Sequence, residues 1–308
     1  MHFLSPLLVL SLQTKAYLAL AAICVIWGTT YAGIKVAVHD FPPFMLVGVR
    51  QTAAGLILLT LAWMTGKAVR ISPRYLLIQA LTGLATITGG NGFITWGLQY
   101  VSTGLSSVIG ALSPVLIAVI SLFWKGKGEK MHPLTLIGVL TGFAGMMLVF
   151  GNGWADFFNP NYRWGIAGCF ASCFSWSLGT VMAKRYNDYA IAPIFNAGLQ
   201  ITAGGIGGFL LSLLFDPPNA LHLTQDGVLA MAYLVLIGSS LAFTLYMFIL
   251  KHLSATMASI YTYINPMVAI LIGWWWLGEH FTAWELIGVA ITISGVWLVN
   301  QGERRGAR

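Results

Sequence analysis

Long apolar segments alternate with short polar ones along the whole chain. Each apolar segment is close to the roughly 20 residues that a helix needs to cross the hydrocarbon core of a bilayer. The predicted spans are 16–37, 44–64, 74–98, 102–124, 133–150, 163–183, 192–215, 227–250, 254–276 and 283–299. The pattern therefore predicts an all-α integral membrane protein with ten transmembrane helices.

One stretch occurs twice in the chain. Residues 102–124 and 254–276 share a first serine, an internal proline and a last tryptophan in the same places. Matched pairs upstream are Trp27 and Trp176, Lys35 and Lys184, Pro43 and Pro193, Gly48 and Gly198, and Gly55 and Gly205. Self-similarity at a fixed spacing is typical of repeat architectures. We expect a short N-terminal leader at 1–14, a first repeat at 15–151, a second repeat at 152–300 and a basic cytoplasmic tail at 301–308.

Basic residues gather in alternate connections. If the N-terminus is cytoplasmic, all of the 16 lysines and arginines except Lys35, Arg50 and Arg163 lie on or near the cytoplasmic side. Cytoplasmic connections retain Lys and Arg, so this distribution predicts an N-in, C-in orientation. Because each half has an odd number of helices, the second half must cross the membrane in the opposite sense. Inverted repeats of this kind are typical of secondary transporters, with a site near the bilayer midplane.

Composition excludes several classes of protein. Hydrophobic residues make up 57% of the chain and charged residues only 8%, far below the roughly one quarter usual in soluble domains. The net charge of +7 therefore reports orientation, not binding to nucleic acid. Cys169 and Cys173 lie four apart without a nearby histidine, which favours packing over a metal site. The predicted helix interiors hold no Asp, Glu or His, so we expect no enzyme, no cofactor and no evident proton-carrying carboxylate.

Polar side chains recur at helical spacing inside several predicted helices. Thr88, Asn91, Thr95 and Gln99 form one such stripe in the third helix. Polar groups are costly in lipid, so stripes in several helices favour an aqueous cavity, although hydrogen bonding between packed helices is the alternative for any single residue. The residues expected to bind substrate are Trp27, Tyr31, Asn91, Thr95, Gln99, Ser107, Trp176, Thr180, Tyr246, Tyr263 and Asn265.

A lysine follows polar and aromatic residues at helical spacing in each of two matching predicted helices. Lys35 follows Trp27 and Tyr31 at spacings of four, as Lys184 follows Trp176 and Thr180. The two lysines could attract a negative substituent to either mouth of an aromatic-lined path, or they could extend to the membrane surface as snorkelling side chains. Arg50, inside the second helix, is expected to snorkel outward, although a substrate carboxylate would suit it.

Pro114 and Pro266 lie in the middle of matching helices. A proline there leaves the carbonyl four residues earlier without a backbone partner. The two positions are either tolerated kinks or hinges. The fifth and tenth helices instead contain glycines or small residues at close spacing, which favours close helix packing over a cavity wall.

The duplicated arrangement resembles the EamA family of the drug/metabolite transporter superfamily. The residues that support the resemblance are Trp27-Gly28, Leu112-Ser113-Pro114, Ile264-Asn265-Pro266, Gly278-Glu279 and Gly128-Glu129. The resemblance implies a multi-pass plasma-membrane (inner-membrane) carrier, often a bacterial exporter of amino acids, whose cavity would lie near Trp27, Asn91, Pro114, Trp176 and Pro266. The first helix lacks the essential glutamate of the small four-helix multidrug members, so their proton antiport cannot be transferred to this chain.

Export of amino acids or related neutral or zwitterionic metabolites by alternating access is therefore the expected function. The expected partners are a small-molecule substrate and the lipid bilayer, without nucleic acid, and the oligomeric state is open. One alternative is efflux of drugs or nucleobase-like compounds. An alternative of another class is a lipid-handling or ligand-binding membrane protein that does not translocate its ligand.

Overall fold

The computed structural model describes residues 11–101, 103–124, 132–149, 158–217, 221, 223–265, 267–268 and 282–306, without the side chains of Tyr31, Ala32, Lys35, Thr103 and Ser107. This described part consists of helices and their connections and contains no strand. Six of its helical stretches are long and apolar enough to cross a membrane. The prediction of an all-helical membrane protein is confirmed, whereas the count of ten helices and the N-in, C-in orientation stay predictions.

The described helices lie within or close to the predicted spans, and some spans are divided among two or three helical elements. Their bounds are α1 Leu12–Ala37, α2 Pro43–Met64, α3 Pro73–Gly83, η2 Leu84–Gly92, α4 Phe93–Gly97, α5 Thr103–Gly110, α6 Ser113–Phe123, α7 Pro133–Val149, η4 Pro160–Tyr162, α9 Arg163–Tyr186, α10 Pro193–Phe215, α11 Gln225–Tyr233, η5 Leu234–Leu241, α12 Ala242–His252, α13 Ala255–Ser259 and α15 Ala283–Gly306. Proline opens α2, α3, α7 and α10, where its missing N–H would have no helical partner anyway. Side chains of Ser11, Ser72 and Thr224 cap α1, α3 and α11.

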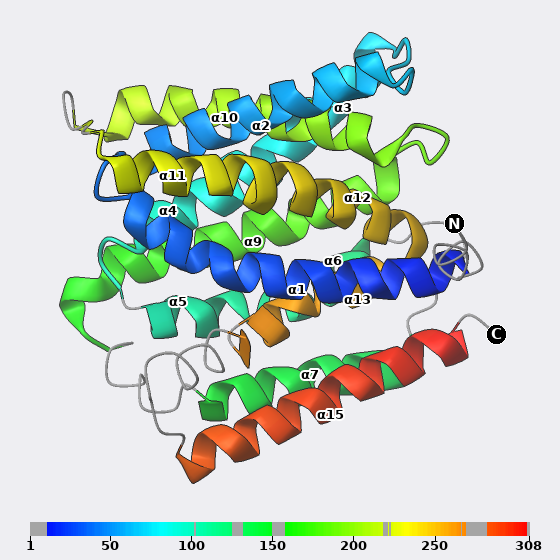
Figure 1. The fold of residues 1–308 in the computed structure, drawn as a ribbon. Helices are drawn as coiled ribbons and strands as arrows, with labels where there is room; N and C mark the ends of the chain where they lie inside the picture. Colours follow the sequence, from blue (N-terminus) through cyan, green and yellow to red (C-terminus); the bar gives the residue numbers. More distant parts are fainter. Residues whose placement is uncertain are drawn as a thin grey trace, which may run out of the picture.

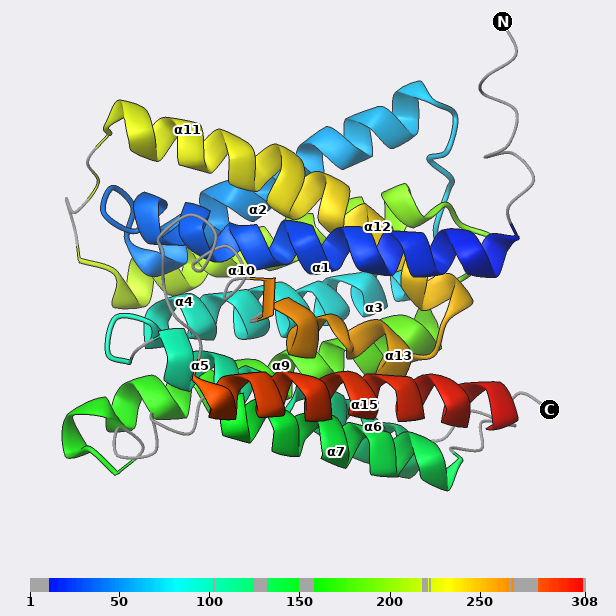
Figure 2. The ribbon, with the colours of Figure 1, turned by 60° about the horizontal axis from the view of Figure 1, so that its bottom comes forward.

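The helices form one bundle with two chemically different ends (Figure 1). The first turn of α1 and the last turn of α15 lie at the same end, as Figure 2 also shows. We call this the basic end, because Lys15, Arg74, Lys184, Arg185, Lys251, Arg304 and Arg305 lie at helix termini there. The opposite end holds the connection 38–42 and the first turn of α11 (Figures 1 and 2).

Glycines bring two helix pairs into close contact. A Cβ atom added to Gly138 in α7 would lie 2.5 Å from the backbone nitrogen of Val299 in α15. One added to Gly295 would lie 2.3 Å from the nitrogen of Gly142. Only glycine permits this backbone approach. The predicted packing role of these two helices is confirmed, and Figure 2 shows them side by side along one edge of the bundle. α2 and α10 also approach closely, with Gly55 against Thr202.

Several of the predicted helices are interrupted within the described residues, including the ninth, where a turn at residue 260 ends α13. The span predicted at 102–124 breaks at residues 111–112 into α5 and α6, with Pro114 in the first turn of α6. Pro114 cannot donate to Gly110, so the first helix ends and a second one starts. The third and eighth predicted spans each contain a π-helical stretch, η2 and η5, between two α-helices. Such stretches often occur at functional sites.

Candidate functional site

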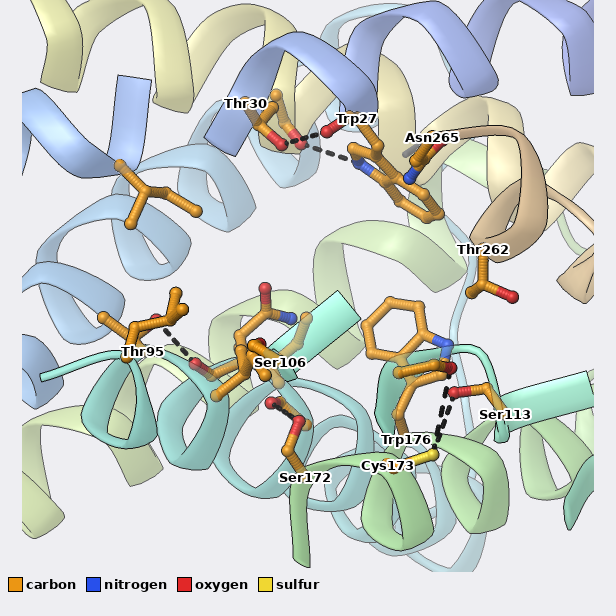
Figure 3. A pocket seen from close by; sticks show the side chains of 18 of the residues that line it. Trp27, Thr30, Thr95, Ser106, Ser113, Ser172, Cys173, Trp176, Thr262 and Asn265 are labelled. Atoms are coloured by element: carbon orange, nitrogen blue, oxygen red, sulfur yellow. Dashed lines mark hydrogen bonds between the residues drawn. The ribbon is translucent and has the colours of Figure 1, made fainter. Parts of the chain in front are cut away.

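A cavity of about 150 Å³ lies between helices of both halves of the chain. Its polar and aromatic lining includes Trp27, Thr30, Arg50, Gln51, Asn91, Thr95, Ser106, Ser113, Ser172, Trp176, Ser239, Tyr261, Thr262 and Asn265. Figure 3 shows side chains from several helices pointing into the same space. Cys169 and Cys173, predicted as packing residues, are buried and also line it.

Aromatic rings form the end of the cavity nearest the basic end. The ring centroids of Trp27 and Trp176 lie 5.7 Å apart with their planes at 82°, an edge-to-face contact. Tyr261 lies 4.5 Å from Trp27, measured between ring centroids. Trp176 also contacts Phe243 and Tyr246 at centroid distances of 6.5 and 5.7 Å. Both tryptophans are half-buried and remain part of the cavity wall (Figure 3).

The π-helical stretches present backbone carbonyls to side chains around the cavity. In η5, the carbonyl of Gly238 accepts from Trp27 Nε1 at 3.1 Å and from Arg50 Nη2 at 3.3 Å. In η2, the carbonyl of Gly90 accepts from the hydroxyl of Ser172. A π-helical turn shifts backbone pairing and so leaves room for such bonds. Sequence reasoning did not identify this feature, and the runs of glycine and serine at 89–90 and 238–240 are the only signal for it.

Arg50 points into the protein. The prediction that it snorkels outward is wrong, because only 5% of its surface is exposed and it lines the cavity. Its Nε donates to Ser239 Oγ at 2.7 Å, in addition to the bond to Gly238. The physical reason is the orientation of α2, whose buried face includes Leu46, Val47 and Ala54 beside Arg50.

Only some residues of the polar stripe predicted in the third helix line the cavity. Asn91 and Thr95 line the cavity, and Thr95 Oγ1 donates to the carbonyl of Asn91 at 2.7 Å. Thr88 instead donates to the carbonyl of Gly204 in α10, and Gln99 is exposed. Because Thr88 and Asn91 lie within η2, where each turn contains more than 3.6 residues, a spacing of three no longer keeps them on one face.

Several other residues predicted to bind substrate lie outside the cavity wall. Thr180 and Tyr246 are fully buried and share a hydrogen bond of 2.7 Å. Tyr263 is fully buried against α7, where its hydroxyl donates to the carbonyl of Val139 at 2.9 Å. Lys184, predicted to act at a mouth of the path, also lies outside the cavity wall: its Nζ donates to the carbonyls of Leu250, in the last turn of α12, and Leu253, just after α12.

Asn265 does line the cavity, and it joins two elements. When the amide is oriented so that its oxygen and its nitrogen both have suitable partners, the nitrogen donates to the carbonyls of Cys24 at 2.9 Å and Tyr261 at 3.0 Å. The side chains of Tyr31, Lys35 and Ser107, and all of Pro266, fall outside the described residues. Pro114 is buried next to the break between α5 and α6.

Apolar packing closes the space between the cavity and the basic end. Residues from the first half of α1, from α12 and from α13 are buried there in one cluster. Members of this cluster are Leu20, Ile23, Tyr246, Met247, Leu250, Met257, Ala258 and Ile260. The lining residues of α1 nearest and farthest from the basic end are Trp27 and Ile34. The cavity therefore extends from the middle of the bundle toward the opposite end.

Comparison with known proteins matches this architecture. The EamA-like transporter family matches the chain twice, over residues 14–151 and 163–301. The uncharacterized inner membrane transporter YedA of Escherichia coli (strain K12) is 31% identical over 290 residues, covering 92% of this chain and 90% of that protein. The uncharacterized transporter YoaV of Bacillus subtilis (strain 168) is 24% identical and covers 93% of this chain and 97% of that protein.

The fold also matches that of a protein of known crystal structure. The TM-score is 0.76 at 20% identity, and the match covers 95% of this chain and 99% of that chain. The sequence matches extend over both halves and confirm the resemblance seen in the sequence. This chain is therefore a multi-pass inner-membrane transporter of small molecules, not an enzyme, and it belongs to the EamA-like transporter family.

Proposed function

We propose that this transporter exports amino acids or related small metabolites by alternating access. In this proposal the chain has ten transmembrane helices in two inverted five-helix repeats, at 15–151 and 152–300. The substrate binds in the cavity described above. Exchange between two conformations then exposes the cavity first to one side of the membrane and then to the other.

The observation that supports this most is the contact between Trp27 and Trp176. These two residues occupy matching positions in the two halves, and their rings meet at the cavity wall with centroids 5.7 Å apart. A site built from equivalent residues of both repeats lies at the repeat interface, which is where inverted-repeat transporters bind substrate. Relative movement of the two halves would alter this contact directly.

Charge supports an orientation for the observed conformation. Basic residues at helix termini gather at the basic end, which favours placing that end in the cytoplasm. The cavity extends away from it, which supports an outward-facing conformation in this proposal. Movement to the inward-facing one would bend the chain at Pro114 and Pro266. Lys184 would have to release the carbonyls of Leu250 and Leu253, and Lys35 would act at the other mouth.

The cavity favours small substrates. A volume of about 150 Å³ is the size of an engineered protein cavity that holds one benzene ring. This suits a single amino acid side chain better than a drug with several fused rings. Among the described lining residues none is Asp, Glu or His, which gives no support to proton coupling through a cavity carboxylate. Substrate exchange without proton movement is therefore the mechanism that we propose.

The test is exchange of labelled amino acids in proteoliposomes, with and without an imposed pH gradient. Saturable exchange that is lost in Trp176→Ala would support the proposal, and its indifference to the gradient would support uncoupled exchange. Absence of exchange for every amino acid would overturn this substrate class. The search would then turn to nucleobases, drugs and lipids.

A further inference from the structure

Arg50 is a buried cation in the wall of the cavity. It lies two turns into α2, on the face that also buries Leu46, Val47 and Ala54. Its exposed fraction is 5%, and that small exposed surface belongs to the cavity lining. An arginine so far inside a membrane bundle is rare, and it usually faces a functional pathway.

Among the described residues, the hydrogen-bond partners of Arg50 are neutral. Nε donates to the hydroxyl of Ser239, and Nη2 donates to the carbonyl of Gly238. No Asp or Glu occurs among the described residues that line the cavity. A guanidinium group has five N–H donors, so these two bonds leave further donors for a ligand. Among the described lining residues the positive charge therefore has no counter-charge, which is costly in a poorly solvated site.

The repeat indicates that packing does not require this charge. Pro43, Gly48 and Gly55 match Pro193, Gly198 and Gly205, so the residue that matches Arg50 is Gln200. Gln200 is fully buried in α10 and bonds to the neutral side chains of Gln79 and Asn187. The fold therefore accepts a neutral amide at the equivalent helix position. The cation belongs to one half only, and that half places it at the cavity.

We infer that Arg50 is the subsite for a substrate carboxylate. The inference rests on the proposed function and specifies its substrate class: a small monocarboxylate whose apolar or aromatic part lies against Trp27 and Trp176. Trp27 and Arg50 share the carbonyl of Gly238 as acceptor, so the aromatic wall and the cation are adjacent. A carboxylate supplies both the missing counter-charge and the acceptors that the free N–H groups need. A second carboxylate would find no second cation among the described lining residues.

The same cavity offers an uncharged hydrogen-bond acceptor for an ammonium group. The amide oxygen of Gln51, the neighbour of Arg50, is buried and has no hydrogen-bond partner among the described residues. It can accept a hydrogen bond from an ammonium group, but it carries no negative charge to attract one. The carboxylate should therefore dominate affinity, and the ammonium group should be optional.

Four matched compounds separate these contributions. Phenylpropionate has only the carboxylate, phenylalanine has both charged groups, phenylethylamine has only the ammonium group, and phenylpropanol has neither. Their affinities are measured by equilibrium binding to the purified full-length protein in detergent. We expect the two carboxylates to bind between about tenfold and about a hundredfold more tightly than phenylpropanol, the range for hydrogen bonds to charged groups.

Variants then assign the effect to Arg50. Arg50→Gln places in α2 the side chain found at the matching position of α10, and it should abolish the preference for carboxylates while changing phenylpropanol binding less than about twofold. Arg50→Lys should restore part of the preference, because lysine keeps the charge without the planar donor pair. The matched control is Arg163→Gln, since Arg163 is an exposed cation at the start of α9, outside the cavity. It should leave all four affinities unchanged.

The outcomes distinguish this inference from the proposed function. Equal binding of all four compounds by the unmodified protein would overturn the carboxylate subsite, even if Arg50→Gln fails to fold. If Arg50→Gln folds but its affinity for all four compounds falls by the same factor, the subsite is also overturned, because that result indicates a structural role for Arg50. Charge-selective binding without exchange in proteoliposomes would support the subsite and reject transport. Amino acid exchange that is unchanged in Arg50→Gln would support transport and reject the subsite.

Discussion

The hydroxyl groups of Thr180 and Tyr246 lie 2.7 Å apart and join α9 to α12 on the basic-end side of the cavity. Both side chains are fully buried, and Tyr246 also contacts the rings of Trp27 and Trp176. This bond lies directly behind the aromatic end of the cavity. It helps to hold that end shut, because α9 and α12 would have to separate before a path to the basic end could open.

Tyr246→Phe should therefore destabilise the observed conformation. The variant leaves a buried threonine hydroxyl without its partner, and such a loss costs about 1–3 kcal/mol. The midpoint of thermal unfolding in detergent should fall. Combining it with Thr180→Val should cost less than the two single losses added together, because both partners of the bond are then removed. Strict additivity in this double-mutant cycle would contradict the bond.

The interface of α7 and α15 should be sensitive to a single methyl group. A Cβ atom on Gly145 would lie 2.6 Å from the backbone nitrogen of Thr292 and 2.7 Å from the carbonyl oxygen of Gly288. Backbone atoms cannot move aside cheaply, so Gly145→Ala should destabilise the protein by about 1–3 kcal/mol, as in other overpacked sites. Gly110→Ala is the control, because a Cβ atom there meets nothing within 4 Å. If both variants unfold at the same temperature as the parent, this packing is wrong.

The tryptophan pair should govern substrate affinity. Trp176→Ala removes a ring from the cavity wall and should weaken substrate binding about tenfold or more, whereas Trp176→Phe keeps an aromatic face and should lose less. Trp63→Ala serves as the control, because Trp63 lies on α2 with 75% of its surface exposed. Exchange rates measured over a range of substrate concentrations would show the differences. A loss in Trp63→Ala as large as in Trp176→Ala would point to general damage.

Sequence reasoning predicted the helical segments and the close packing of α7 with α15 because both depend on local signals. Length and hydropathy identify a span, and closely spaced glycines identify a tight contact. The matching tryptophans were found from the repeat alone. These features require no knowledge of which way a helix faces.

Which face of each helix points into the bundle was harder to predict. In a membrane bundle an apolar helix surface faces either lipid or other helices, so hydropathy does not indicate that Arg50 points inward. The π-helical stretch η2 changes the turn angle, so the periodicity that aligned Thr88 with Asn91 was misleading. Thr180 and Tyr246 were grouped with substrate-binding residues on polarity, although their hydroxyls satisfy one another. In each case the missing information is a contact between distant segments.

The orientation of the cavity can be tested by chemical accessibility. Thr262 lines the cavity and is half-buried, whereas Thr256 in α13 is 3% exposed on the basic-end side. In a background without Cys24, Cys169 and Cys173, Thr262→Cys should react with a membrane-impermeant thiol reagent added to intact cells.

Thr256→Cys is the matched control and should stay unmodified until the protein unfolds, because apolar packing separates it from the cavity. A bound substrate should slow modification of Thr262→Cys by occupying the same space, whereas it should not affect Arg163→Cys, an exposed position at the start of α9 outside the cavity. Modification of Thr262→Cys only from the cytoplasmic side, in inverted vesicles, would reverse the proposed orientation. The basic end would then face outward, and the distribution of lysine and arginine would need another explanation.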